Sequence, residues 1–365
     1  MKIKTPTLIV NKKIVLANIK RMIKKAEKNK VLLRPHFKTH QSAEVGNWFM
    51  GLGVKAIAVS SVRMAKCFEK AGWKDITIAF PINILELDEI NDLAKRIKLG
   101  ILVESIEVVK LLQKKLETNV AVWIKIDTGY NRTGIKWDKY DTIAKLAKEI
   151  KISDNQIFEG LLTHAGHSYK ARSNSEILEI HKDTINKMLN LKTELEIQGI
   201  YDVKISVGDT PTASIADDFT GVDEIRPGNF VYYDLKQEQI TSCSEKDIAI
   251  RLACPVVSKN KERLELVIDG GAIHLSKDFI VDEKGKKIFG YLSPGSVEEW
   301  GTRIENSYVS SISQEHGIIK VDKEYFNEIN IGDVLLIIPV HACLTANIMK
   351  NFRLTTGEAF KALCT

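Results

Sequence analysis

The chain alternates short apolar, β-branched runs with longer segments of helical period from about residue 12 to residue 235. Parallel strands joined by helices produce this alternation. The runs predict strands at 31–34, 55–60, 75–80, 99–103, 120–126, 158–163, 203–207 and 224–230. Helices are predicted in the intervals at 12–29, 41–52, 62–72, 85–96, 105–117, 138–150 and 174–198, with a short one after Pro211.

The number of these repeats decides the architecture. Eight strand–helix units within about 220 residues are typical of a (β/α)8 barrel of the TIM type. An open doubly wound sheet is the alternative, but no G-x-G-x-x-G follows the first predicted strand, which disfavours a dinucleotide-binding fold. The predicted fold class is therefore α/β, with a barrel in the N-terminal part.

The pattern changes after Tyr233. The β runs at 248–258, 263–269, 308–313, 317–321 and 334–339 are separated by turn residues and show little helical period. They predict a second, all-β domain. We expect the barrel to occupy residues 10–240 and the β domain to occupy residues 241–365 together with residues 1–9, although the segment 6–10 could add a strand to either part.

The composition describes an ordinary globular chain, with 44% hydrophobic and 27% charged residues. The formal charge of +6 comes mostly from dispersed lysines, and the lysine-rich segment 20–30 fits the solvated face of an amphipathic helix. No nucleic-acid-binding module accompanies it, so we expect no nucleic-acid partner. Because no apolar stretch is long enough for a signal peptide or a membrane span, we expect a cytoplasmic protein with no membrane partner.

The cysteines argue against a disulfide framework. They are odd in number, widely and irregularly spaced, and include no C-x-x-C pair, so we expect reduced thiols that serve mostly as small core residues. They are Cys67, Cys243, Cys254, Cys343 and Cys364.

The candidate chemistry begins directly after the first strand, in the segment 34–40 with the sequence RPHFKTH. Pro35 cannot continue a β-ladder, and two histidines and two cations occupy the residues around it. A lysine just beyond a buried strand end can have its pKa lowered by desolvation and neighbouring cations, as an amine needs to form a Schiff base or to abstract a proton. Lys38 is therefore a candidate functional amine, and a basic surface loop is the alternative interpretation.

Polar residues also follow several of the other predicted strands. In a TIM barrel the C-terminal ends of the strands lie on one face, where the chemistry gathers. We therefore expect these residues to converge with His40 and Lys38. They are Ser60 and Ser61, and the segments 127–134 (DTGYNRTG), 164–169 (HAGHSY), 206–212 (SVGDTPT) and 226–229 (RPGN).

The loops after the seventh and eighth strands are where such barrels commonly bind phosphate. Gly208, Thr210 and Gly228 suit this use, although Gly-Pro turns at the rim of a scaffold would explain each loop alone. Together with Lys38 they predict a phosphorylated carbonyl cofactor that is held by its phosphate at one end and by a Schiff base at the other. Pyridoxal 5'-phosphate (PLP) has this chemistry.

The remaining polar side chains on this face each have two interpretations. Arg132 could hold a carboxylate or a cofactor oxygen through paired hydrogen bonds, or be an ion-paired loop arginine. His164 and His167 could stack on or hydrogen-bond to a ring, or form structural hydrogen bonds. Tyr169 could be an acid or base, or a buried aromatic side chain.

A late motif places His341 and Cys343 directly after the apolar run 334–338. In an extended segment, residues two apart point to the same side, so an imidazole and a thiolate could contact one ion, and nitrogen with sulfur suits zinc. Two protein ligands are fewer than the three or four of tight zinc sites. The turn at Glu315 and His316 could add a ligand or a supporting contact, with a surface turn as the alternative.

Together these motifs resemble the family of PLP enzymes that contains the metal-dependent D-serine dehydratases and D-threonine aldolases, which are fold-type III enzymes related in fold to alanine racemase. The most specific element is RPHxKTH near the start combined with a late HxC or HxD. The resemblance extends over nearly the whole chain, through TPTLIV at 5–10, RPHFKTH at 34–40, NRTG at 131–134, HAGHSY at 164–169, GDTPT at 208–212, EIRPGN at 224–229, EHG at 315–317 and HAC at 341–343.

The resemblance implies a role for each candidate residue. Lys38 would carry PLP and take the Cα proton of a D-amino acid, and His341 with Cys343 would bind the metal that coordinates the substrate β-hydroxyl group. β-Elimination from D-serine would then give pyruvate and ammonia. Catalytic roles would fall to Tyr169 and Arg132 beside Lys38, and cofactor contacts to His164, Gly208, Thr210, Arg226, Gly228 and Asn229.

The same residues could support a second reaction. If the hydroxyl group is deprotonated rather than expelled, retro-aldol cleavage gives glycine and an aldehyde, and 3-hydroxyaspartate is a further possible substrate. Aldolases of the family more often have HxD and dehydratases HxC, so Cys343 favours a dehydratase. Two residues depart from the family pattern: Gln41 stands where a lysine is common, and Asp209 where a small hydroxyl residue is frequent. A carboxylate beside a phosphate is repulsive unless it points away.

Two other classes share part of this pattern. A non-catalytic PLP carrier would have no use for His341 and Cys343, and such proteins tend to be single barrels without a β domain. An amino-acid racemase would share the architecture but would need a second acid or base and no metal. By analogy of fold we expect a homodimer with a small-molecule D-amino acid substrate.

Overall fold

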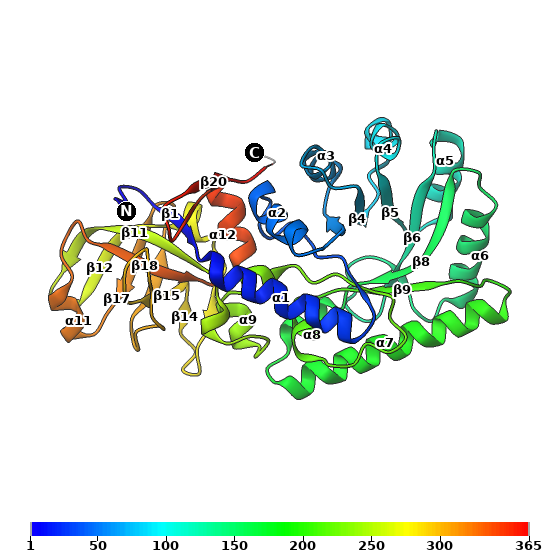
Figure 1. Ribbon diagram of the computed structural model, residues 1–365. Coiled ribbons are helices and arrows are strands. Elements are labelled where there is room, and N and C mark those ends of the chain that lie inside the picture. The colour runs from blue at the N-terminus through cyan, green and yellow to red at the C-terminus, as the bar shows by residue number, and fades with distance from the viewer. Residues whose placement is uncertain (1, 364–365) are drawn as a thin grey trace.

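The computed structural model of the protein describes residues 2–363 and consists of a helix-covered barrel beside a sheet-rich second part (Figure 1). Every barrel strand predicted from the sequence is present. They are β2 (Leu32–Leu33), β3 (Ala56–Val59), β4 (Asp75–Pro81), β5 (Lys98–Val103), β6 (Val120–Asp127), β8 (Gln156–Thr163), β9 (Lys204–Val207) and β10 (Glu224–Ile225), with the short β7 (Ile135–Lys136) paired to β6.

The barrel closes at the segment that directly follows β2. The strands are parallel and run in the order β2-β10-β9-β8-β6-β5-β4-β3, which leaves β2 and β3 at the two ends. Between them, the amide of Phe37 donates to the carbonyl of Ala58 at 2.9 Å, and the amide of Ala58 donates to the carbonyl of Pro35 at 3.0 Å. A parallel bridge between His36 and Ala58 completes the ring. The segment RPHF therefore joins the two ends of the barrel.

Helices cover the outside of the barrel (Figure 1). Side chains of Asn11, Ser61, Ser105 and Ser173 accept hydrogen bonds from amides of the first helical turn, which explains where four of these helices begin. The helices are α1 (Lys12–Lys28), α2 (Ala43–Gly51), α3 (Val62–Lys70), α4 (Leu87–Ala94), α5 (Ile106–Lys115), α6 (Tyr140–Lys151), α7 (Asn174–Ile197) and α8 (Thr210–Ile215), with short 3-10 turns η1 (Ile84–Glu86), η2 (Gly166–Lys170) and η3 (Asn229–Val231).

The second part is built on one large sheet with the strand order β12-β17-β16-β15-β18-β11-β1-β19-β20. The N-terminal strand β1 (Thr7–Val10) lies in this sheet, antiparallel to β11 and parallel to β19. The other elements are β11 (Ile250–Asn260), β12 (Glu265–Asp269), β13 (Ile280–Val281), β14 (Lys287–Ile288), β15 (Gly290–Ser293), β16 (Tyr308–Ile312), β17 (His316–Lys320), β18 (Val334–Pro339), β19 (Asn351–Leu354) and β20 (Ala359–Lys361), with α9 (Leu235–Gln239), η4 (Glu245–Asp247), α10 (Ala272–Leu275), α11 (Lys323–Glu328) and α12 (Ala342–Met349).

The prediction of a strand at 224–230 was wrong in length. Only Glu224 and Ile225 pair as a strand, and residues 229–231 form the turn η3. Pro227 has no amide to offer a ladder, and Gly228 passes close to the backbone of His36, so the chain turns inward over the barrel instead of continuing. Several elements of the β domain, including β15, β19 and β20, were not predicted.

The sequence predicts no membrane-spanning segment and no disulfide framework. None of the helices within residues 2–363 combines the length and hydropathy that crossing a bilayer requires. Cys67, Cys243, Cys254 and Cys343 are free thiols, and Cys364 lies outside the described residues.

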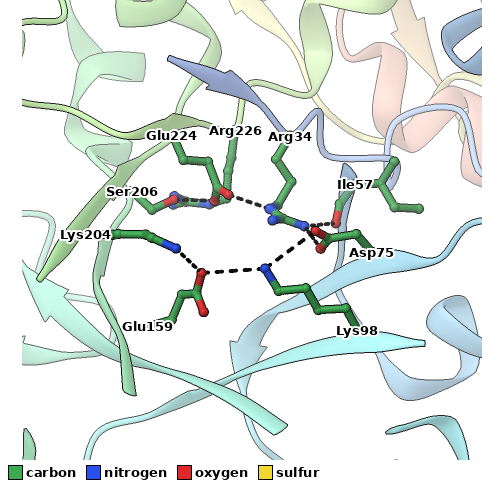
Figure 2. A network of polar contacts seen from close by, with 9 residues as sticks. All are labelled: Arg34, Ile57, Asp75, Lys98, Glu159, Lys204, Ser206, Glu224 and Arg226. Carbon is green, nitrogen blue, oxygen red and sulfur yellow. Dashed lines mark hydrogen bonds and ion pairs between the residues drawn. The ribbon is translucent and has the colours of Figure 1, made fainter. Parts of the chain in front are cut away.

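A network of polar side chains crosses the barrel interior (Figure 2). Arg34 donates from Nε to Oε2 of Glu224 at 2.6 Å and from Nη1 to Oδ1 of Asp75 at 2.5 Å. Ser206 donates from Oγ to the other oxygen of Glu224 at 2.6 Å, and Arg226 donates from Nη1 to the same Oγ. The side chains of Arg34 and Glu224 are each only 4% exposed. Because a buried charge is tolerated only when it is paired, this network fixes both arginines within the barrel.

The network predicts a large difference between two glutamates. Glu224→Ala leaves the buried guanidinium of Arg34 without its main partner and should lower the free energy of unfolding by about 3–5 kcal/mol, as measured by urea denaturation. Glu117→Ala, which removes the exposed partner of Lys95, should leave the unfolding midpoint almost unchanged. Equal effects of the two substitutions would contradict a structural role for the network.

Candidate active site

The candidate site is a cavity of about 300 Å³ at the C-terminal ends of the barrel strands, closed on one side by residues from α9 and the start of α12. Of the residues to which the resemblance assigns a catalytic, cofactor or metal role, all except Thr210 line this cavity. The predicted residues in the lining are Lys38, Arg132, His164, Tyr169, Gly208, Arg226, Gly228, Asn229, His341 and Cys343. Asp209 also lines the cavity, as do His36 and Tyr130, which belong to segments expected at this face but were given no individual role. Four further polar residues of the lining were not predicted: Lys125, Asp234, Lys236 and Gln237.

Lys38 is held by the packing of its neighbours. Phe37 is fully buried, with ring centroids 5.0–5.1 Å from those of Phe49, Phe68 and Trp73. The amide of Lys38 donates to Nδ1 of His36 at 3.3 Å. Because Phe37 points into the core, its two neighbours His36 and Lys38 are left to line the cavity.

Not every polar residue after the first two strands reaches the cavity. His40 packs against Phe37 and Phe49, and burial lowers the pKa of its imidazole to about 3. Its Nδ1 accepts the amide of Ser42 at 3.1 Å, so it is a neutral core histidine. Ser61 caps α3, and with Ser60 it lines a separate, smaller cavity. Neither serine lines the cavity that contains Lys38.

The loop after β9 resolves the question that Asp209 raised. The carboxylate of Asp209 accepts the amide of Thr212 at 2.8 Å, the hydroxyl of Thr212 at 2.8 Å and the hydroxyl of Ser168 at 2.9 Å. Asp209 is thus the N-cap of α8, and its charge is directed into the helix start. Burial raises the pKa of Asp209 despite these hydrogen bonds. A bound phosphate would therefore meet a carboxylate whose oxygens already have partners.

Thr210 supports the site instead of lining it. Its hydroxyl accepts the amides of Asn229 at 3.0 Å and of Gly228 at 3.3 Å, which ties the loop after β9 to the loop after β10. At Gly228, a Cβ atom would lie 2.9 Å from the carbonyl oxygen of His36, so only glycine fits there without a shift. The two loops and the turn before Lys38 therefore form one tightly packed edge of the cavity.

His164 has a defined tautomer. Its Nδ1 contacts the carbonyl of Gly208, and a carbonyl only accepts, so Nδ1 carries the proton and Nε2 keeps its lone pair. Burial holds the pKa of His164 well below its usual value, so the ring is neutral. The ring lies 5.8 Å from that of Tyr130, and the guanidinium of Arg132 lies 5.0 Å from the Tyr130 ring centre. His167 does not line the cavity.

Tyr169 remains protonated at neutral pH, because burial raises the pKa of its phenol well above the usual value. Its oxygen accepts the amide of Thr210 at 3.3 Å. The phenol is thus a hydrogen-bond donor that the fold keeps at the wall of the cavity.

The cavity is rich in positive charge. Lys125 is 6% exposed, and burial, followed by the charges of Arg226 and Arg132, lowers the pKa of its amine to about 7. Arg226 donates to the carbonyl of Thr163 at 2.5 Å, and burial lowers its pKa to about 10, so it stays charged. Lys38 and Lys236 complete the set. This donor set suits a ligand with several negative charges, such as a phosphate with a carboxylate.

His341 and Cys343 lie side by side, but not in a strand as predicted. Strand β18 ends at Pro339, His341 is the extended N-cap residue of α12, and Cys343 lies in the first turn of that helix. The extended spacing argument was therefore wrong, although both side chains do face the cavity. Thr39 contacts Cys343 with its hydroxyl 3.2 Å from Sγ, and Asn229 donates to the same sulfur at 3.7 Å.

In the part of the chain that the structure describes, this pair has no third protein ligand. Within residues 2–363, no three His, Cys, Asp or Glu residues are grouped so that they could hold an ion. His316 begins β17, pairs with Asp269 and is exposed, so the turn at 315–317 adds no ligand. A metal held by His341 and Cys343 would keep its remaining positions open for water or substrate.

Asp234 was missed although it organises this edge of the site. Asp234 is buried, with only 1% of the residue exposed, and its side chain is the N-cap of α9. The carboxylate also accepts hydrogen bonds from the amide of Ala342 at 2.8 Å and from Nδ2 of Asn229 at 2.6 Å. It therefore joins the barrel loop to the helix that carries Cys343. Its local sequence, YYDLKQ, holds a helix-cap signal, but nothing in it indicates the two distant partners.

A barrel with a lysine after its first strand, a cation-rich cavity at the strand ends and a partner β domain defines an alanine-racemase-like enzyme. The family model described as "Alanine racemase, N-terminal domain" matches residues 10–236, and a second model, "Putative serine dehydratase domain", matches residues 249–355. The chain belongs to the alanine racemase N-terminal domain family. The predicted family and fold are thereby confirmed.

Relatives match along almost the entire chain. D-serine dehydratase of Dictyostelium discoideum is 28% identical over 97% of this chain and 94% of its own length. D-threo-3-hydroxyaspartate dehydratase of Delftia sp. is 29% identical over 93% of this chain and 91% of its own length. D-threonine aldolase of Arthrobacter sp. is 23% identical over 95% of this chain and 88% of its own length. These names agree with the predicted enzyme class, a lyase.

A solved structure shows the same arrangement of both parts. A mutant of D-threo-3-hydroxyaspartate dehydratase in the metal-free form superposes with a TM-score of 0.92 at 25% identity, over 99% of this chain and 98% of that one. The likeness therefore includes the β domain as well as the barrel.

Proposed function

We propose that the protein is a PLP-dependent lyase that removes water from D-3-hydroxy amino acids with the help of a divalent metal ion. One observation carries the proposal: the predicted cofactor lysine and the predicted metal pair, some 300 residues apart in sequence, line one cavity. The hydroxyl of Thr39, the residue next to Lys38, lies 3.2 Å from Sγ of Cys343. A carbonyl cofactor and a metal ion at these residues would both reach the same substrate.

The residues around the cavity fit PLP. Lys125, Arg132 and Arg226 line the cavity and supply positive charge for the phosphate and phenolate oxygens of PLP. Because Gly228 has no side chain, the loop after β10 can pack against the backbone of His36 at the edge of the cavity. Asp209 does not oppose this fit, since its oxygens are engaged by Ser168 and Thr212. When bound, PLP supplies an electron sink for the Cα–H bond of an amino acid.

Proton transfer then falls to the chain's own groups. Lys38 holds an amine at the cavity wall, where it would take the Cα proton. Tyr169 keeps its phenol proton and can donate a hydrogen bond, while Nε2 of the neutral His164 can accept one. Arg132 remains free to hold the substrate carboxylate or a cofactor oxygen.

His341 and Cys343 fit a divalent metal through the chemistry of their donors. An imidazole nitrogen with a thiolate sulfur suits Zn²⁺ better than Mg²⁺ or Ca²⁺, which prefer oxygen ligands. As a Lewis acid, a bound metal makes the β-hydroxyl of the substrate a better leaving group. With two protein ligands among the described residues, positions for that hydroxyl remain available.

The choice between elimination and aldol cleavage rests on two lines of support. Cys343 stands where dehydratases of the family more often have cysteine, and the relatives at 28–29% identity are named dehydratases. The alternative is a D-threonine aldolase or a 3-hydroxyaspartate lyase, which would use the same lysine and metal pair.

The products and the effect of a chelator test this proposal. The PLP-loaded protein should release pyruvate from D-serine or oxaloacetate from D-3-hydroxyaspartate. Dialysis against a chelator should lower kcat/KM by more than about 100-fold, because a metal that assists the leaving group contributes several kcal/mol. Zn²⁺ added back should restore the activity.

Other outcomes would decide against parts of the proposal. Glycine as the main product would contradict the dehydratase assignment and favour the aldolase. Full activity after complete removal of metal would contradict the role of His341 and Cys343. Formation of the opposite enantiomer without loss of the hydroxyl group would indicate a racemase.

We further propose that the protein is a homodimer. The support is the exposure of two large apolar side chains at the end of β4 and just after it, with Phe80 57% and Leu85 88% exposed, together with the tendency of oligomeric enzymes to form symmetric dimers. Sedimentation velocity at micromolar concentration should give the mass of two chains, and a single 41.0 kDa species would contradict the proposal.

A further inference from the structure

The predicted metal ligand His341 has a carboxylate partner from a distant part of the chain. Nδ1 of His341 lies 2.7 Å from Oδ2 of Asp278. Asp278 lies between α10 and β13, whereas His341 directly precedes α12. The contact therefore joins two separate segments of the β domain at the edge of the cavity.

This hydrogen bond determines which nitrogen of His341 can bind a metal. A carboxylate oxygen only accepts, so Nδ1 carries a proton and donates it to Asp278. Nε2 is then the one ring nitrogen left for an ion, and the ring is also in contact with Cys343. The arrangement is the carboxylate–histidine pair by which proteins orient an imidazole toward a metal.

The backbone around Asp278 holds the carboxylate in place. Its amide donates to the hydroxyl of Ser276 at 3.2 Å, and Ser276 has a positive φ of 72°, which L-residues adopt only at a cost. Ser276 is the C-cap residue of α10, so the helix ends at this conformation. The hydroxyl of Thr345, on α12, donates to the carbonyl of Leu275 at 3.3 Å, so the segment before Asp278 is tied to the helix that carries Cys343.

A cation completes the arrangement. Nζ of Lys236 lies 3.8 Å from the same oxygen of Asp278 that contacts His341. The backbone amide of Lys236 donates to the carbonyl of Val340, the residue before His341, at 3.2 Å. Lys236 thus contacts both segments, Asp278 through its side chain and Val340 through its backbone amide.

We propose that Asp278 is a positioning residue that fixes the tautomer and the orientation of His341 for metal binding, with Lys236 as its supporting ion pair. The inference rests on the metal role proposed above. A surface ion pair without this role would also place Asp278 near Lys236, but it would have no effect on how tightly His341 and Cys343 hold an ion.

The affinity for zinc in the full-length protein, measured by competition with a chromophoric chelator without added substrate, tests the inference. Asp278→Leu should weaken zinc binding about 10–100-fold, as is usual when such a supporting carboxylate is lost. Asp278→Asn should weaken it less, because the amide oxygen still accepts from Nδ1. Lys236→Met should have a smaller effect than Asp278→Leu, since the carboxylate remains.

Two controls separate this role from a loss of folding. Asp183→Ala removes a carboxylate of an exposed ion pair on α7 and should leave zinc affinity unchanged. The thermal unfolding midpoint of Asp278→Leu without metal should stay close to that of the unchanged protein. Wild-type zinc affinity in Asp278→Leu would overturn the inference alone, and a wild-type protein that holds no zinc would overturn the proposed metal function together with it.

Discussion

The closure of the barrel at residues 35–37 is the constraint on which the site depends. The hydrogen bonds of Pro35 and Phe37 with Ala58 join the ends of the parallel sheet, and the burial of Phe37 among aromatic rings locks the turn. Lys38 follows directly and is therefore placed by the hydrophobic core of the barrel instead of by a ligand. A site built in this way is organised before the cofactor binds, so little free energy is spent on ordering it.

The second requirement is to keep positive charge at the centre of a barrel without losing stability. Arg226 donates to the carbonyl of Thr163 and to the hydroxyl of Ser206. Ser206 in turn donates to Glu224, which pairs with Arg34 (Figure 2). The carboxylates nearest the cavity, Asp209 and Asp234, are both N-caps of short helices, so their oxygens accept amide protons. The cations can thus attract an anionic ligand, while the nearby carboxylates are stabilised by hydrogen bonds from the chain's own amide and hydroxyl groups.

The sequence was sufficient for the barrel and for most of the site because both depend on local signals. Buried strands such as β6 are continuous apolar runs, and the residues after each strand meet on one face whatever the details of packing. Lys125 was missed because a single lysine inside the run VAVWIKID looks like an exception to the pattern, although a charge in a buried strand is the signal that could have identified it.

The features of the site that the sequence did not predict depend mostly on contacts between distant segments. Pro339 marks the end of β18, but nothing in the local sequence shows that a helix begins at Ala342, so an extended segment was predicted for His341 and Cys343. The hydroxyl of Thr210, a predicted cofactor residue, accepts the amides of a neighbouring loop, a contact that the local sequence does not indicate. The contacts of Asp234 with Ala342, and of Asp278 with His341, span 108 and 63 residues, and no spacing rule predicts them.

The central claim is that Lys38 is the amine that binds the carbonyl cofactor, and the cavity contains a direct rival in Lys125, whose lowered pKa of about 7 would also suit a Schiff base. The most direct test is to load the protein with PLP, reduce it with borohydride and locate the modified lysine by peptide mass spectrometry. The structure predicts that the label lies on Lys38 and is absent from Lys38→Ala. A label on Lys125, or one that persists on the protein after Lys38→Ala, would contradict the account.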